Sequence, residues 1–87
     1  MTMPTQQKLL LVYGKTHITL EKAVEDWLPH INTNTARRRA RNQTLPWPVI
    51  ASEESQKSSC FVSIAAIAEW LDQQENKAQQ EWAKMHN

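Results

Sequence analysis

The residues of this sequence best suited to chemistry are four arginines within five positions, Arg37, Arg38, Arg39 and Arg41. No acidic residue separates them, and a helix that only needed solubility would usually avoid such repulsion between like charges. Arginine can donate two hydrogen bonds to O6 and N7 of guanine, and its charge also pairs with backbone phosphates. We therefore predict that this segment contacts duplex DNA.

The distribution of charge supports the same partner, although the net charge of the chain is only +1. Residues 1–36 are balanced, residues 37–57 carry +3 and residues 58–87 carry −2. Positive charge is thus concentrated in the middle of the chain. An uneven field of this kind steers a protein toward a polyanion.

Two predicted helices position the arginines. Ile18 and Thr19 have the character of a hydrophobic residue before a helix and of its N-cap. The apolar residues that follow have the spacing of an amphipathic helix and are Leu20, Ala23, Val24, Trp27 and Leu28. Pro29 ends this helix, and Asn32 is a suitable N-cap for a second helix from Thr33 to about Gln43. Two short helices joined by a few residues indicate a helix-turn-helix.

The second helix has a narrow apolar side, formed by Ala36 and Ala40. The N-terminal half of such a helix enters the major groove. The candidate contacts with base edges are therefore Asn34, Arg37 and Arg38. Arg39 and Arg41 are expected to contact phosphates, and Thr35 flanks the same face. These six residues form the main predicted DNA-binding site.

A small hairpin is predicted after the second helix, because Pro46-Trp47-Pro48 forbids helix and favours extended backbone. Its strands are expected at Val49–Ala51 and Cys60–Val62. We interpret this hairpin as a wing. Gln56 and Lys57 at its tip are candidates to reach the DNA backbone or minor groove.

The ends of the chain complete the predicted architecture. Gln6–Tyr13 fits either a short helix or a buried strand, and Gly14 ends it. Ser63 is the expected N-cap of a last amphipathic helix, whose period continues to the C-terminus. Its apolar positions are Ile64, Ile67, Ala68, Leu71, Ala78, Trp82 and Met85.

The four tryptophans are assigned mostly structural roles. We expect Trp27 and Trp70 in the core, and Trp47 packing the wing onto the body. Trp82 lies in polar surroundings near the end of the chain, which is typical of a subunit contact. It is a candidate for a homodimer through the C-terminal helix.

The remaining residues argue against catalysis and against a metal site. Cys60 is the one cysteine, and His17, His30 and His86 are scattered along the chain. This composition excludes an internal disulfide and offers no ligand cluster for zinc. We expect no catalytic residues, no metal and no cofactor, and therefore not an enzyme.

The sequence also argues against a membrane protein. The longest apolar run, Leu9–Tyr13, has five residues, whereas a transmembrane helix needs about 20. The first seven residues lack the basic start and apolar run of a signal peptide. We therefore expect a cytoplasmic protein with no membrane partner.

Several segments of the chain together resemble one family. In chain order they are Tyr13-Gly14, Ile18-Thr19-Leu20-Glu21, Thr35-Ala36-Arg37-Arg38-Arg39-Ala40, Leu45-Pro46-Trp47-Pro48, Ser55-Gln56-Lys57-Ser58 and Glu69-Trp70-Leu71-Asp72. Their order and spacing are similar to those of the pyocin activator proteins (PrtN family), small bacterial regulators related to the excisionase and MerR-type winged helices. The resemblance covers about Leu9 to Trp82. It implies an activator of bacteriocin or prophage genes that binds upstream DNA, with a helix at Leu9–Tyr13.

We therefore expect a mainly α fold with a small β-hairpin wing, a winged helix-turn-helix of the MerR/excisionase type. Residues 1–87 would form a single DNA-binding domain, with a helical extension at about 72–87. The expected function is sequence-specific transcriptional activation, by a bacterial or phage-encoded protein associated with the nucleoid. Double-stranded DNA and RNA polymerase are the expected partners. Two alternatives stay open: an excisionase-like factor that bends DNA for recombination, and a protein-interaction module that uses the basic helix.

Overall fold

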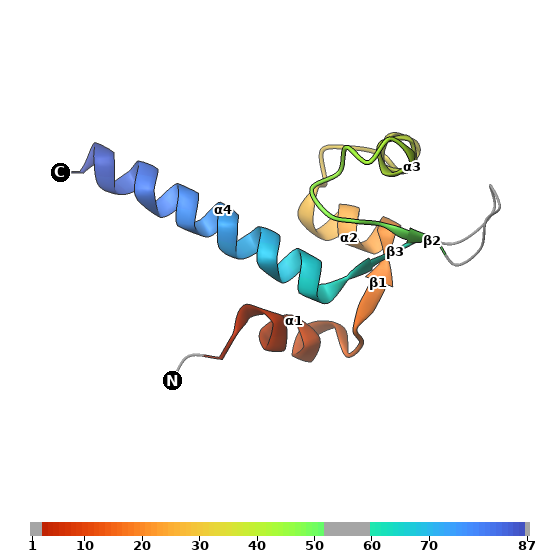
Figure 1. Cartoon of the computed structure of the whole chain (residues 1–87), viewed down its shortest axis with the longest axis horizontal. Coiled ribbons are helices and arrows are strands. Elements are labelled where there is room, and N and C mark those ends of the chain that lie inside the picture. The colour runs from red at the N-terminus through yellow and green to blue at the C-terminus, as the bar shows by residue number, and fades with distance from the viewer. Residues whose placement is uncertain (1–2, 52–59, 87) are drawn as a thin grey trace.

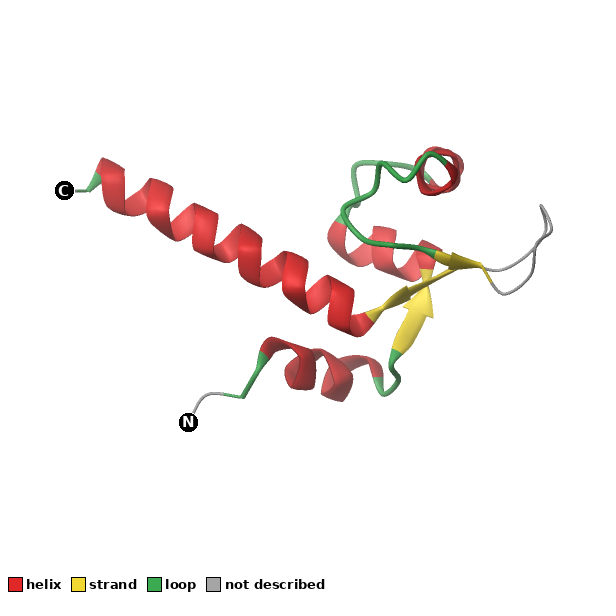
Figure 2. Cartoon of the chain, viewed as in Figure 1, coloured by secondary structure: helices red, strands yellow, loops and turns green. Residues whose placement is uncertain are grey.

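The computed structural model describes residues 3–51 and 60–86 (Figures 1 and 2). In this part of the chain four helices surround a small sheet. The elements are α1 (Thr5–Tyr13), β1 (His17–Thr19), α2 (Leu20–Trp27), α3 (Thr33–Arg41), β2 (Ile50–Ala51), β3 (Cys60–Ser63) and α4 (Ile64–Met85). A mainly helical fold with a small β component is thus confirmed.

The sheet has three antiparallel strands in the order β1-β3-β2. The predicted pairing of β2 with β3 is confirmed, and Ile50 lies opposite Phe61. Strand β1, in which Ile18 pairs with Val62, was not predicted from the sequence. Both of these side chains are buried, so β1 connects the sheet to the core.

The ambiguous N-terminal segment is a helix, as the family resemblance implied. Gly14 ends α1 in the left-handed conformation, with φ of 71°, and donates its backbone N–H to the carbonyl of Leu10 at 2.8 Å. Leu9 is buried, and the Thr5 hydroxyl donates to Asp72 Oδ1 at 2.6 Å. Through these contacts α1 packs along the first half of α4.

The core is small and entirely apolar in the described residues. Its buried side chains are Leu9, Ile18, Leu20, Ala23, Val24, Leu28, Ala36, Trp47, Val62, Ile64, Ile67 and Ala68. Apart from Leu28 and Trp47, they come from all four helices and from strands β1 and β3. The sheet and α4 therefore connect the N-terminal helix to the helix-turn-helix.

Trp47 fixes the segment that follows α3 to the body, as predicted. Its side chain is 3% exposed, and its ring meets the half-buried ring of Trp70 edge to face at 5.4 Å between centroids. Trp27 is also half-buried against the core. The packing of Trp47 is thus confirmed, whereas Trp27 and Trp70, which were expected in the core, lie partly buried against it.

The first half of α4 packs on the body, and the second half extends away from it (Figure 1). Ser63 caps the helix, because its hydroxyl accepts from Ala65 N–H at 3.1 Å. The last helix continues to Met85, as its periodicity predicted. Within residues 3–51 and 60–86, no helix combines the length and apolar character needed to cross a membrane.

Tyr13 joins α1 to α2 through a small polar network. Its hydroxyl donates to Asp26 Oδ2 at 2.6 Å and accepts from Trp27 Nε1 at 3.0 Å. Burial, reinforced by the hydrogen bond to Asp26, raises the pKa of Tyr13 to about 12 from its ordinary value of 10.0. Because the folded state favours the neutral phenol, this contribution to stability is complete below pH 10 and decreases as the pH rises to about 12.

The chain has one tyrosine, so its ionisation can be followed without interference. We expect an ultraviolet titration of the native protein to give a midpoint of about 12. Asp26→Asn should lower that midpoint, because the carboxylate that holds the proton is gone. A native midpoint at the ordinary tyrosine value, with folding verified by circular dichroism, would contradict this network.

Candidate nucleic-acid interface

The helix that carries the arginines, α3, begins at a well-formed cap. Asn32 precedes it, and its Oδ1 accepts from Thr35 N–H at 2.7 Å, as the sequence predicted. Ala36 is 1% exposed against the core, and Ala40 is partly buried. These small side chains let α3 pack closely against α2.

The C-terminus of α3 closes in a Schellman motif. Thr44 N–H donates to the carbonyl of Arg39 at 2.9 Å, and Gln43 N–H donates to that of Ala40 at 3.2 Å. This closure requires a left-handed residue, and Gln43 supplies it with φ of 55°. Glycine usually occupies such a position because a side chain there is strained.

Arg39 takes part in this closure, and its expected contact with phosphates stays a prediction. Its Nη2 donates to the carbonyl of Thr44 at 2.7 Å, and the Thr44 hydroxyl donates back to the Arg39 carbonyl at 3.3 Å. The side chain is half-buried. Arg39 therefore has a structural role in ending α3.

Arg37 is also engaged, by a residue that the sequence analysis did not select. Its Nη2 lies 2.9 Å from Oε1 of Glu21, in the first turn of α2. The hydrogen bond from Arg37 is the main cause that lowers the pKa of Glu21. The stabilisation of this pair is therefore present above the ordinary pKa of glutamate and is lost as the pH falls. Both side chains are well exposed, so the pair contributes about 1 kcal/mol at most.

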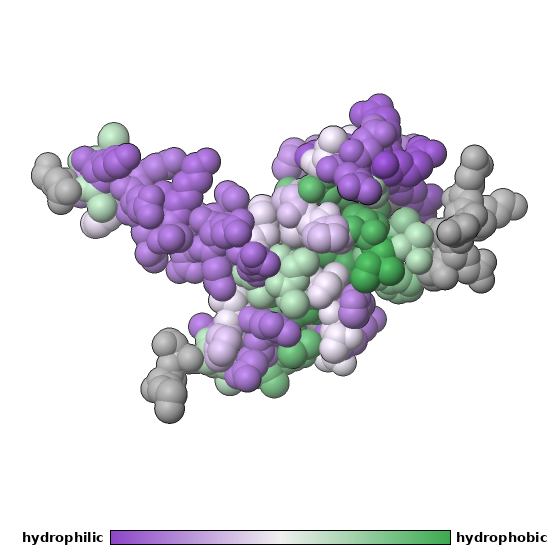
Figure 3. Space-filling view, viewed as in Figure 1, coloured by the Kyte–Doolittle hydropathy of each residue, from purple (hydrophilic) through white to green (hydrophobic). Residues whose placement is uncertain are grey.

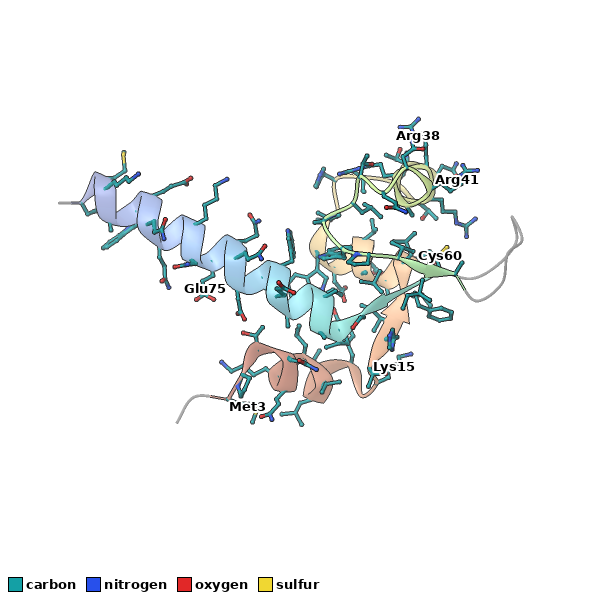
Figure 4. The ribbon with its side chains drawn as sticks, in the orientation of Figure 1. Met3, Lys15, Arg38, Arg41, Cys60 and Glu75 are labelled. Atoms are coloured by element: carbon teal, nitrogen blue, oxygen red, sulfur yellow. The ribbon has the colours of Figure 1, made fainter. Side chains whose placement is uncertain are left out.

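Arg38 and Arg41 differ from the other two arginines. Both are exposed, and neither side chain makes a hydrogen bond or ion pair with another residue of the described part of the chain. Figure 4 shows both side chains directed away from the body of the protein. Two of the four guanidinium groups are thus available to an external partner.

The surroundings of these arginines are strongly polar. Asn34 is exposed and Thr35 is half-buried on the same helix. In Figure 3 hydrophilic residues cover α3, while apolar residues gather on the body beneath it. The wing candidates Gln56 and Lys57 lie outside the described residues. Within the described ranges, no three histidine, cysteine or acidic residues are arranged to hold a metal ion.

These features define a class of protein: a small helix-turn-helix domain whose second helix presents a basic outer face. The chain belongs to the family of the pyocin activator protein PrtN, whose model matches residues 5–78. That match runs from the start of α1 through most of α4. Separate comparisons with curated proteins and with solved structures found no match.

The geometry predicts different effects on stability for the free and the engaged arginines. Arg39→Ala should lower the free energy of unfolding by about 1 kcal/mol, since the cap of α3 loses a hydrogen bond. Arg38→Ala and Arg41→Ala should change it by less than about 0.5 kcal/mol. Urea denaturation followed by tryptophan fluorescence measures all three. Equal losses in the three variants would contradict the role given to Arg39.

The left-handed backbone of Gln43 at the end of α3 leads to a second prediction about stability. Gln43→Gly should raise the free energy of unfolding by about 0.5–1 kcal/mol, because glycine adopts the left-handed conformation without strain. The matched control is Asn42→Gly at a right-handed position, with φ of −88°. It should lower stability, because glycine there only adds freedom to the unfolded chain. Thermal denaturation should separate the two variants in opposite directions.

Proposed function

We propose that this protein is a sequence-specific DNA-binding transcriptional activator of bacteriocin or prophage genes. The observation that carries the proposal is the exposed pair Arg38 and Arg41, which have no partner among the described residues and sit on the outer face of α3. Membership of a family named for an activator of pyocin genes supports the same function.

The difference between free and engaged arginine side chains suggests which part of the DNA each would contact. Arg38 lies nearer the start of α3 and, with Asn34 and Thr35, is proposed to contact base edges in the major groove. Arg41 is proposed to contact phosphates, which position the helix without selecting a sequence. Arg37, held by Glu21 at the edge of this surface, is proposed to contact DNA from a restricted position.

The proposal extends to the whole chain. Residues 1–87 would act as one DNA-binding domain in the bacterial cytoplasm, with residues 72–87 as a helical extension. Gln56 and Lys57 remain predicted wing contacts. Activation requires a further contact, for which RNA polymerase is the proposed partner. A regulator of this kind needs no catalytic residue and no cofactor.

The test is selection from a random duplex library, followed by binding measurements on the recovered sequence. Arg38→Ala should weaken binding and relax the base preference, by about 1–3 kcal/mol of lost discrimination. Arg41→Ala should weaken all sequences about equally and reduce the slope of log affinity against log salt by about one.

Lys84→Ala is the matched control, because it removes one positive charge from α4 far along the chain from α3. It should leave affinity and base preference unchanged. Equal losses for Arg38→Ala and Arg41→Ala on every sequence would contradict the separate roles. Recovery of no sequence even at low salt would contradict DNA binding and favour a protein partner for α3.

A further inference from the structure

The second half of α4 contributes no buried residue that would explain why it is helical. Every residue from Asp72 to His86 is exposed, and this segment extends away from the body (Figure 1). Isolated helices of about 15 residues are marginal in water. A partner that covers one face of this segment would stabilise it.

One face of α4 has the pattern of a helix that pairs with another helix. Apolar residues recur at alternating intervals of four and three, with one acidic interruption. The positions are Ile64, Ala68, Leu71, Glu75, Ala78, Trp82 and Met85. This spacing is the a and d repeat of a coiled coil. We call it the α4 stripe.

The burial of the α4 stripe changes along the length of the helix. Ile64 and Ala68 are buried in the core and Leu71 is packed against it. Beyond Glu75, in contrast, Trp82 is 64% exposed and Met85 is 83% exposed. The same helical face thus contributes to the core at one end and is largely exposed at the other, where the ring of His86 stacks on Trp82 at 4.2 Å between centroids.

We propose that a second copy of this chain covers the outer part of the α4 stripe, with the two helices antiparallel. The sequence of the stripe is complementary to itself in that orientation. When the two helices cross near residue 80, Trp82 of each copy faces Ala78 of the other. A large side chain then meets a small one in two equivalent layers, which is how closely packed helices interdigitate.

Charge also favours the antiparallel arrangement. A parallel pair would place the two Glu75 carboxylates against each other inside the seam, which is unfavourable. In the antiparallel register Glu75 lies near the end of the overlap, opposite Met85, and its carboxylate can reach water. Figure 4 shows Glu75 directed away from α4 into open space.

The size of the overlap indicates a weak association. Residues 74–86 of each copy give an overlap of about 20 Å at 1.5 Å per residue. Such a contact is smaller than the roughly 800 Å² per partner of a standard interface. We therefore expect an equilibrium between monomer and dimer in the micromolar range, and the position of Trp82 at its centre makes this residue the main contributor.

The test is sedimentation equilibrium of the full chain without DNA. The wild-type protein should show a concentration-dependent dimer, and Trp82→Glu should remove it. The matched control is Gln80→Glu, which adds the same charge on the opposite face of α4. A monomer at several hundred micromolar, or equal effects of the two variants, would overturn the proposal.

A second variant keeps the test decisive if Trp82→Glu unfolds the end of α4. Glu75→Leu replaces the one acidic residue of the stripe, so it should strengthen association by about tenfold or more. Gln80→Leu adds the same side chain outside the stripe and should not strengthen it. Failure of Glu75→Leu to promote the dimer would overturn the proposal, and neither result depends on whether α3 binds DNA.

Discussion

The organisation of this protein depends on how little of α3 can be buried. A helix with four arginines in its nine residues contributes one buried side chain to the core, that of Ala36. Hydrophobic burial therefore cannot hold it alone. Its position comes instead from the Asn32 cap, the Schellman closure at Gln43 and two of its own arginines.

Because so little of α3 is buried, its four arginines have different roles. Arg39 ends the helix and Arg37 joins it to Glu21 on α2, so both contribute to position before any partner arrives. Arg38 and Arg41 remain available. The outer face of α3 is therefore positioned by hydrogen bonds at its edges. The small apolar body of the protein supports this helix from the other side. That body is itself held together by β3, the central strand, and by the packing of Trp47 on Trp70.

Much of this arrangement follows from local sequence. The caps at Thr19, Asn32 and Ser63 were predicted, because each depends on a side chain within a few residues of the helix it begins. The role of Ala36 followed from helical periodicity. Strand β1 was missed, since three residues between two helices carry no clear period and acquire their structure only by pairing with β3.

The engagement of Arg37 and Arg39 could not be predicted for a similar reason. Glu21 is sixteen residues from Arg37, and no spacing rule within one helix connects them. The closure by Arg39 depends on a left-handed glutamine, at a position where sequence would suggest glycine. Sequence identified the basic helix, and tertiary structure determined which of its charges are free.

Amide NMR spectra recorded during addition of a selected duplex would show whether the outer face of α3 is the surface that meets DNA. We expect the largest changes at residues 33–41, with the side-chain signals of Arg38 and Arg41 shifting more than that of Arg39. Changes confined to α1 or to the end of α4, with α3 unaffected at low salt, would contradict this expectation.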